Sequence, residues 1–329
     1  MIIMRKKMLI GKPDYNPVLL ITNFEGYGDL LCHTPSIRIL SQIAPNLDVW
    51  CKRPEPFFLN PCIKNLSVYS ERELVIPSKY EDRVILISVD SQGHFPHCTI
   101  HNVDLFSIKA MRKILRYREK TVEAYWSLQD KQRVQKLLQQ HRVADDRFVV
   151  ITPAITWPSR TLPLPFYQEL IVGIQRRGYQ VVLVGKEISY TRDANEMNKT
   201  LYDAAHFPGA ISLYNQLSFA ELCALYSITP IAINSQNGNT WASCTNDFCW
   251  NLFIPTLSAP EYSLPFRHGS QFYKAAAVGN AADYYPASVY SKHDYETYLD
   301  MPILLPPVQE VLTAFESILT CIHLKKNSL

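Results

Sequence analysis

The sequence has no long apolar run. Its residues are 47% hydrophobic and 19% charged, which is a globular composition, yet no stretch approaches the roughly 18–20 apolar residues of a membrane span. The apolar residues that follow Lys7 end at Gly11, which is too short for the roughly 7–15-residue core of a secretory signal. We therefore expect a cytoplasmic globular protein, and 329 residues are enough for two domains.

Paired cysteines are missing as well. The eight cysteines are scattered along the chain without a Cys-x-x-Cys pair, and several stand in the apolar contexts typical of buried thiols. We expect reduced packing residues rather than a disulfide framework. Residues 90–101 gather three His, one Cys and one Asp, but their spacing matches none of the standard zinc patterns. We therefore expect no metal and no other cofactor.

Acidic residues are scarce where basic residues are densest. Residues 1–145 hold 21 Lys and Arg against 15 Asp and Glu, whereas the remainder holds 12 against 15. The excess is densest in what we call the basic segment, residues 109–120, where Glu119 is the single acid. Its cations are Lys109, Arg112, Lys113, Arg116, Arg118 and Lys120. Basic residues interleaved with aromatic rings suit a polyanion, but a solvated helix face would have the same composition, so both interpretations stay open.

An acidic residue follows the first apolar run of the chain. Residues 18–21 are typical of a buried strand, Gly26 and Gly28 form a turn, and a helix is predicted to begin at or just after Asp29. The carboxyl edge of a strand, beside a helix N-terminus, is where open α/β sheets bind ligands. Asp29 is therefore a candidate general base or phosphate-side residue. The alternative is a helix N-cap, a position that Asp favours.

Apolar runs and helical periodicity alternate along the whole chain, which predicts parallel sheets. The predicted strands are residues 18–21, 47–50, 66–69, 84–89, 148–152, 180–184, 228–233 and 251–254. The predicted helices include residues 30–43, 105–117, 130–142 and 308–323. We place a hinge at residues 144–146. This divides the chain into a first domain (1–145), a second domain (146–305) and a terminal helix region (306–329) that packs back on the first domain.

Five short elements follow one another in a fixed order. They are Gly28-Asp29 with Pro35, a strand followed by Trp157-Pro158 and a basic residue, a strand ending at Gly185, the helix-like run FAELCAL, and Gly238-x-x-x-Ala242. In this order they resemble glycosyltransferase family 9, the heptosyltransferase family, over residues 28 to about 269. The resemblance implies the GT-B fold, an α/β architecture in which two Rossmann-like domains with parallel sheets face a central cleft.

The resemblance also implies roles for individual residues. Asp29 would be the catalytic base, with Asp90 as the back-up, and Gly26 and Gly28 would let the acceptor approach the backbone. The donor-binding residues would lie in the second domain: Thr156, Ser159, Arg160, Gly185, Lys186, Glu187, Gln236, Asn237, Gly238, Asn239 and Thr240. The acceptor would lie on the first domain, where the candidate contacts are His97, His101, Lys109, Arg112, Lys113 and Arg116. A surface role for Arg160 and ordinary loop positions for the two histidines stay open.

The last loop departs from the family pattern. The family has Asp-Ser/Thr-Gly-x-x-His there, whereas this sequence has Gln-Asn-Gly-Asn-Thr-Trp over residues 236–241. Gly238 is kept, but the acidic residue and the histidine are not, so a heptose donor should not be assumed. Gln236 and Asn237 could contact the hydroxyls of a different sugar. Alternatively, the loop is a structural turn in a non-catalytic homologue.

The implied function is sugar transfer from a nucleotide-sugar donor to a hydroxyl of an anionic acceptor such as lipopolysaccharide core, with inversion and without a metal. Three alternatives stay open: transfer to hydroxylated bases of bacteriophage DNA, a non-catalytic protein that binds nucleotide or glycan, and a nucleic-acid-binding module. The expected partners are the nucleotide sugar and the anionic acceptor, and peripheral membrane association is compatible with a lipid-linked acceptor. The donor sugar, the nucleotide base and the oligomeric state stay open.

Overall fold

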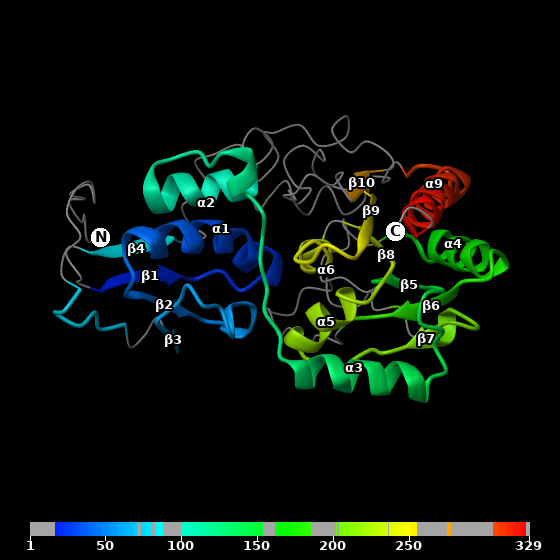
Figure 1. Cartoon of the computed structure of the whole chain (residues 1–329), viewed down its shortest axis with the longest axis horizontal. Coiled ribbons are helices and arrows are strands. Elements are labelled where there is room, and N and C mark those ends of the chain that lie inside the picture. The colour runs from blue at the N-terminus through cyan, green and yellow to red at the C-terminus, as the bar shows by residue number, and fades with distance from the viewer. Residues whose placement is uncertain are drawn as a thin grey trace.

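The protein contains two parallel β-sheets that lie side by side along its long axis (Figure 1). The computed structural model describes residues 17–70, 74–80, 83–87, 101–153, 162–185, 202, 204–235, 237–254, 275–277 and 305–326. Strand order is β3-β2-β1-β4 in the first sheet and β10-β9-β8-β5-β6-β7 in the second. Every strand pairing that the structure describes is parallel. The predicted α/β fold with two Rossmann-like domains is confirmed.

The first domain is built around β1 and the long helix that follows it. Its elements are β1 (Val18–Thr22), α1 (Tyr27–Ile43), β2 (Leu47–Cys51), η1 (Glu55–Phe57), β3 (Asn65–Val68), β4 (Val84–Ile87), α2 (Asn102–Met111) and η4 (Tyr117–Glu119). All five residues of β1 are apolar or Thr and all are buried, as expected for a central parallel strand that is covered on both faces. Alternate β1 residues therefore enter two clusters: Val18 and Leu20 face one, whereas Leu19 and Ile21 face the other.

The second domain has the larger sheet. Its elements are α3 (Leu128–Gln140), β5 (Phe148–Ile151), α4 (Leu164–Arg176), β6 (Gln180–Leu183), η7 (Ala204–His206), β7 (Ile211–Ser212), α5 (Phe219–Tyr226), β8 (Ile231–Ser235), α6 (Gly238–Ser243), β9 (Trp250–Ile254), β10 (Ala275–Ala277) and α9 (Val308–Lys326). Phe148 and Val150 of β5 belong to the same apolar cluster as Val18 and Leu20 of the first domain. One continuous core therefore joins the two domains.

Helix ends differ from the predicted ones because capping fixes them. The helix predicted over residues 105–117 runs over Asn102–Met111. The ring of His101 caps its start by accepting a hydrogen bond from the backbone N–H of Val103 (3.2 Å). Arg112 ends it in the left-handed conformation, with φ 55°. Neither feature alters the apolar periodicity from which a helix is predicted.

The C-terminal helix packs differently from the prediction. We expected residues 306–329 to pack back on the first domain, but in the structure α9 packs on α4 and β9 of the second domain. The contact depends on Gly173 of α4, where an added Cβ would lie 2.6 Å from Leu312 of α9. At the edge of this contact, Arg177 is paired with Glu316 (2.6 Å).

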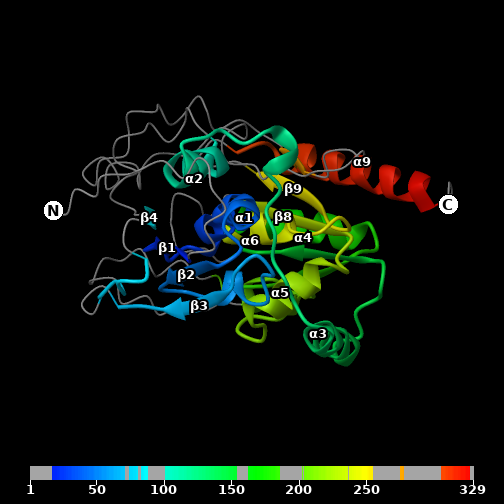
Figure 2. The ribbon, with the colours of Figure 1, turned by 60° about the vertical axis from the view of Figure 1, so that its left-hand side comes forward.

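Helix α3 also contacts the second domain. It lies before the predicted hinge at residues 144–146, yet it packs along α5 (Figure 1 and Figure 2). At this contact the side chain of Arg133 is paired with the buried Glu221 (3.0 Å). By its contacts, α3 therefore lies with the second domain. The domain boundary itself stays a prediction.

The segment that leads to α3, residues 119–126, is bonded to α1, and we call it the crossing segment. The Arg38 guanidinium donates to the backbone carbonyls of Glu119 (2.7 Å) and Thr121 (3.2 Å) and forms an ion pair with Glu123. Ser127 then begins α3 with a capping box, in which its hydroxyl accepts from Asp130 N–H. Only residues 124–126 lie between these two anchored points.

Pro35 interrupts the hydrogen bonding of α1 without ending the helix. It has no N–H to donate to the carbonyl of Leu31, but the hydroxyl of Thr34 donates to that carbonyl instead (2.7 Å). The same hydroxyl accepts the backbone N–H of Glu123 (2.9 Å). Thr34 therefore supplies the hydrogen bond that the Leu31 carbonyl would otherwise lack, and it binds the crossing segment at the same time.

None of the helices in the described part of the chain is both long enough and apolar enough to span a membrane.

We expect Thr34→Val to lower the free energy of unfolding by about 1–3 kcal/mol, because two buried groups lose their hydrogen-bond partner. Denaturant unfolding measures the effect. Thr313→Val is the matched control, since Thr313 makes the same kind of bond to a helix carbonyl (Gln309, 2.9 Å) on the exposed face of α9. Equal losses in the two variants would contradict the role assigned to Thr34.

Candidate functional site

The first turn of α1 carries Asp29. The helix begins at Tyr27 with Gly26 as its N-cap residue, and Leu30 N–H donates to the Gly26 carbonyl (3.0 Å). The N-cap alternative for Asp29 is therefore wrong, because Asp29 is the third residue of the helix. Its side chain is partly exposed, and its Oδ2 lies 2.5 Å from the position that a Cβ on Gly26 would take. The carboxylate thus lies over the N-cap residue, where a negative charge interacts favourably with the helix dipole.

A buried histidine ties this turn to the end of β1. His33 Nδ1 lies 2.6 Å from the backbone carbonyl of Asp29, and its Nε2 lies 3.2 Å from the hydroxyl of Thr22. Since a carbonyl only accepts, Nδ1 carries the proton and Nε2 accepts from Thr22. The ring stacks on Phe106 of α2, with centroids 4.1 Å apart. The last residue of β1, the first turn of α1 and α2 are thereby linked through one side chain.

His33 is neutral over most of the pH range. Burial lowers its pKa from 6.5 to about 4, which outweighs the opposing hydrogen bond to the Asp29 carbonyl. Lys109 adds to the lowering through its charge, although its own pKa is lowered to about 8 because it is half-buried. The neutral ring keeps the hydrogen-bond pattern that holds the first turn of α1.

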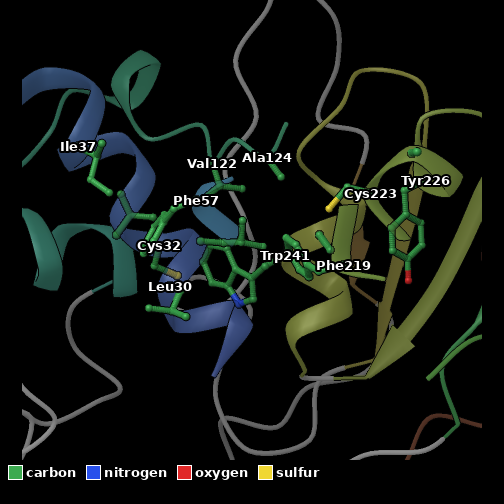
Figure 3. Packing of buried hydrophobic residues seen from close by; sticks show 14 of the residues in the cluster. Leu30, Cys32, Ile37, Phe57, Val122, Ala124, Phe219, Cys223, Tyr226 and Trp241 are labelled. Atoms are coloured by element: carbon green, nitrogen blue, oxygen red, sulfur yellow. The ribbon is translucent and has the colours of Figure 1, made fainter. Parts of the chain in front are cut away.

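The two domains meet at this turn, through glycines. A Cβ added at Gly28 would lie 2.9 Å from Cδ1 of Trp241 and 3.3 Å from Cα of Gly238. A Cβ added at Gly238 would lie 3.2 Å from the backbone N of Gly28. Figure 3 shows Trp241 between Leu30 of α1 and Phe219 of α5. The side of Gly28 on which a side chain would project is therefore covered by α6.

Aromatic contacts beside this turn also join the two domains. The ring of Tyr27, the first residue of α1, lies edge-on to Phe219 of α5 with centroids 4.7 Å apart. The Tyr27 hydroxyl donates to Glu55 of η1 (3.2 Å), and the Arg53 guanidinium lies 5.6 Å from the centre of its ring. Tyr27 and η1 of the first domain therefore lie against α5 of the second.

The loop between β8 and α6 is held largely by its own hydrogen bonds. Asn237 is the N-cap residue of α6, and its side-chain oxygen accepts Asn239 N–H (2.7 Å). Thr240 is buried, and its hydroxyl donates to the Ser235 carbonyl (2.7 Å). Asn237, Gly238 and Asn239 are partly exposed. Of the predicted donor contacts on this loop, Thr240 and Asn237 therefore make hydrogen bonds that favour a structural role, although Asn237 stays partly exposed.

His101 lies at the same interface. Its ring is buried and lies edge-on to Trp241, with centroids 5.9 Å apart. Because its Nδ1 accepts the N–H of Val103, a neutral His101 carries its proton on Nε2. This predicted acceptor contact is thereby brought close to Gly28 and to the loop that holds Gly238.

The basic segment contains more ion pairs than the sequence suggests. Arg116 pairs with Glu119 (2.7 Å) and Lys113 lies 4.0 Å from the same carboxylate. The hydrogen bonds from Arg116 lower the pKa of Glu119 to about 2. Lys120 pairs with Asp104. Since α2 ends before Arg112, these cations do not share one helix face, and at least Lys113, Arg116 and Lys120 form ion pairs.

Several predicted site residues lie outside the described residues. These are Asp90, His97, Thr156, Ser159, Arg160, Lys186, Glu187 and Gln236. Gly185 is described, and its carbonyl accepts the N–H of Asn215 (3.0 Å). In the part of the chain that the structure describes, no three His, Cys, Asp or Glu side chains gather as metal ligands.

A groove of about 290 Å³ lies between α3 and the loop that leads into α5. It contains none of the predicted site residues. It is lined by Arg133, Val134, Lys136, Leu137, Gln140, Gln216, Leu217 and Glu221.

Comparison with known proteins gives a family match over part of the chain and a fold over most of it. The sequence pattern of glycosyltransferase family 9 (heptosyltransferase) matches residues 79–233. A family 9 glycosyltransferase structure from Veillonella parvula matches with a TM-score of 0.68 and 14% identity, covering 93% of this chain and 98% of that chain. E. coli ADP-heptose LPS heptosyltransferase II matches with a TM-score of 0.57 and 16% identity, covering 93% and 99%. The search of curated proteins finds no match.

A third solved structure agrees with these two. TibC, an iron-containing dodecameric glycosyltransferase of enterotoxigenic E. coli, matches with a TM-score of 0.59 and 15% identity, covering 93% of this chain and 77% of that chain. At such identities the structural matches establish the fold, which is that of GT-B glycosyltransferases. The family match over residues 79–233 confirms the resemblance to glycosyltransferase family 9 in that part of the chain.

Two residues at this site are not predicted from the sequence. The sequence indicates Trp241 only as a departure from the family pattern, and no motif points to His33. An apolar residue in a loop that otherwise reads polar was the available signal for Trp241. For His33 the signal was a histidine one helical turn after Asp29, on the same face.

We expect protonation of His33 to destabilise the fold in acid. The unfolded chain takes up this proton near pH 6.5 and the folded chain only near pH 4, so the stabilisation is complete above pH 6.5 and is lost as the pH falls toward 4. The shift corresponds to roughly 3 kcal/mol. Denaturant unfolding between pH 7 and pH 4 should therefore show a weaker pH dependence in His33→Gln than in the wild type. His141→Gln, at an exposed histidine after α3, should keep the wild-type dependence. An unchanged dependence in His33→Gln would contradict the assignment.

Proposed function

We propose that the protein is a nucleotide-sugar-dependent glycosyltransferase that transfers a sugar to a hydroxyl of an anionic acceptor, with inversion and without a metal. The observation that supports it most is the position of Asp29. This partly exposed carboxylate lies in the first turn of α1, beyond the carboxyl end of β1, where α6 of the second domain meets the first domain. Ligands of Rossmann-like sheets bind at this edge.

The proposed reaction is a direct displacement. The acceptor oxygen attacks the anomeric carbon and its proton passes to the Asp29 carboxylate. The bond between that carbon and the donor phosphate breaks, and its electron pair leaves with the nucleoside diphosphate. Arg160, with Thr156 and Ser159, would stabilise the negative charge that develops there. These three roles are carried over from the family resemblance.

The donor is a nucleotide sugar of open identity. TibC has been solved in complex with ADP-D-β-D-heptose, so ADP-sugars are the first class to test. Trp241 stands where the family has histidine, and Gln236 where it has aspartate. A sugar other than heptose is therefore compatible with this loop.

The acceptor is proposed to be an anionic glycan rather than DNA. Three of the six cations of the basic segment pair with Glu119 or Asp104, which reduces the charge available to a long polyanion. Arg112 and Arg118 are exposed and suit a few phosphates. A cytoplasmic location with peripheral membrane contact would suit a lipid-linked acceptor.

A thermal-shift panel with ADP-, UDP-, GDP- and CDP-sugars tests the donor site. A bound donor at about 100 times its Kd should add roughly 2.7 kcal/mol, which is several degrees for domains of this size. We expect a shift with one nucleotide class in the wild type and its loss in Arg160→Ala.

Arg176→Ala is the matched control, because Arg176 is exposed at the C-terminal end of α4, far from the carboxyl edge of the sheet. It should keep the wild-type shift. No shift with any nucleotide sugar would contradict the proposed function and favour a non-catalytic homologue. A shift retained in Arg160→Ala would remove Arg160 from the donor site.

A further inference from the structure

Trp241 belongs to the second domain but is enclosed by the first. Its indole lies directly on the backbone of Gly28, because a Cβ there would be 2.9 Å from Cδ1 of the ring. The ring of His101 lies edge-on to it, and only 6% of Trp241 is exposed. The residue after Gly28 is Asp29. The indole therefore contacts the helix turn that carries the proposed base.

The backbones beside Trp241 are equally close. Gly28 and Gly238 approach so tightly that a Cβ on either would lie 3.2–3.3 Å from backbone atoms of the other. Backbone atoms cannot move aside as the end of a flexible side chain can. The distance between the first turn of α1 and the start of α6 is thus fixed by atoms that have little freedom.

We propose that Trp241 is a positioning residue: by packing on Gly28 and His101, it sets the place of Asp29 relative to the second domain. The inference rests on the proposed function, in which Asp29 is the base and the second domain holds the donor. A base acts only within hydrogen-bond reach of the proton that it removes. A misplacement of about 1 Å can cost roughly 100-fold in rate.

The position of Trp241 explains why a glycine occurs at residue 28. An alanine at residue 28 would push the indole and α6 away from α1, since its methyl group and Cδ1 cannot both occupy the same space. Removal of the indole would free that space and leave the longer contact with the Gly238 backbone (3.3 Å). The effects of Gly28→Ala and Trp241→Ala on the position of Asp29 should therefore not be additive.

The carboxyl ¹³C resonance of Asp29 gives a test that needs no substrate. It is assigned by its loss in Asp29→Asn and followed through a pH titration. We expect Trp241→Ala to shift the resonance and its titration midpoint. Gly28→Ala should shift the Asp29 resonance and its titration midpoint further in the wild-type background than in the Trp241→Ala background.

Trp250→Ala is the matched control. Trp250 is a partly buried indole of the same domain, and it packs in the cluster that contains α4 and α9. It should leave the Asp29 resonance unchanged. Trp241→Phe serves as a second variant if Trp241→Ala does not fold, and it should produce a smaller shift in the same direction. An Asp29 resonance that stays at its wild-type value in the Trp241 variants, or fully additive effects of the two substitutions, would overturn the proposal.

Enzyme kinetics provide a second test, with the nucleotide sugar that raises the melting temperature of the protein as donor. Trp241→Ala should lower kcat about tenfold or more and change the donor KM little, because it moves the base and leaves the donor contacts in place. A loss confined to KM would also overturn the proposal. Failure of all nucleotide sugars to bind would contradict the proposed function, whereas an unmoved Asp29 resonance would contradict only the role of Trp241.

Discussion

The close approach of two glycine backbones is the constraint on which the assembly of this protein depends. Gly28 lies in the first turn of α1 and Gly238 begins α6, and each covers the position that a side chain on the other would need. Asp29 follows the first glycine directly, and Trp241 lies one helical turn after the second. The contact that joins the two domains therefore also fixes the surroundings of the proposed base. We therefore expect a change that separates the domains to alter the position of Asp29.

Helix α1 is the element that connects these constraints. At its start it meets α6, in its first turns it is tied to β1 through His33, and further along it holds the crossing segment through Thr34 and Arg38. The crossing segment then leads into α3, which packs on the second domain. The second domain is thus linked to α1 in two ways: α6 contacts the start of α1, and the crossing segment leads from α1 to α3. Because α1 is buried over much of its length, the turn that carries Asp29 belongs to a well-packed framework.

The sequence predicted the sheets better than the contacts between elements. Parallel strands buried on both faces read as apolar runs, so β1 and β5 were located almost to the residue. The ends of α2 were missed because they depend on a histidine cap at His101 and a left-handed Arg112, which periodicity does not reveal. The candidate site was likewise predicted only where its sequence signal is local. The edge position of Asp29 came from a local strand–turn–helix motif, whereas the packing of Trp241 on Gly28 joins residues far apart in the chain and leaves no local signal.

Sugar transfer by Asp29→Asn tests the central claim most directly. The product of the wild-type protein with its stabilising nucleotide sugar and a phosphorylated glycan acceptor is measured by mass spectrometry, beside that of the variant. Asparagine keeps the shape of the side chain but cannot take a proton, so we predict that transfer falls about 100- to 10,000-fold while the donor-induced melting shift is retained. Transfer at the wild-type rate by Asp29→Asn would contradict the account.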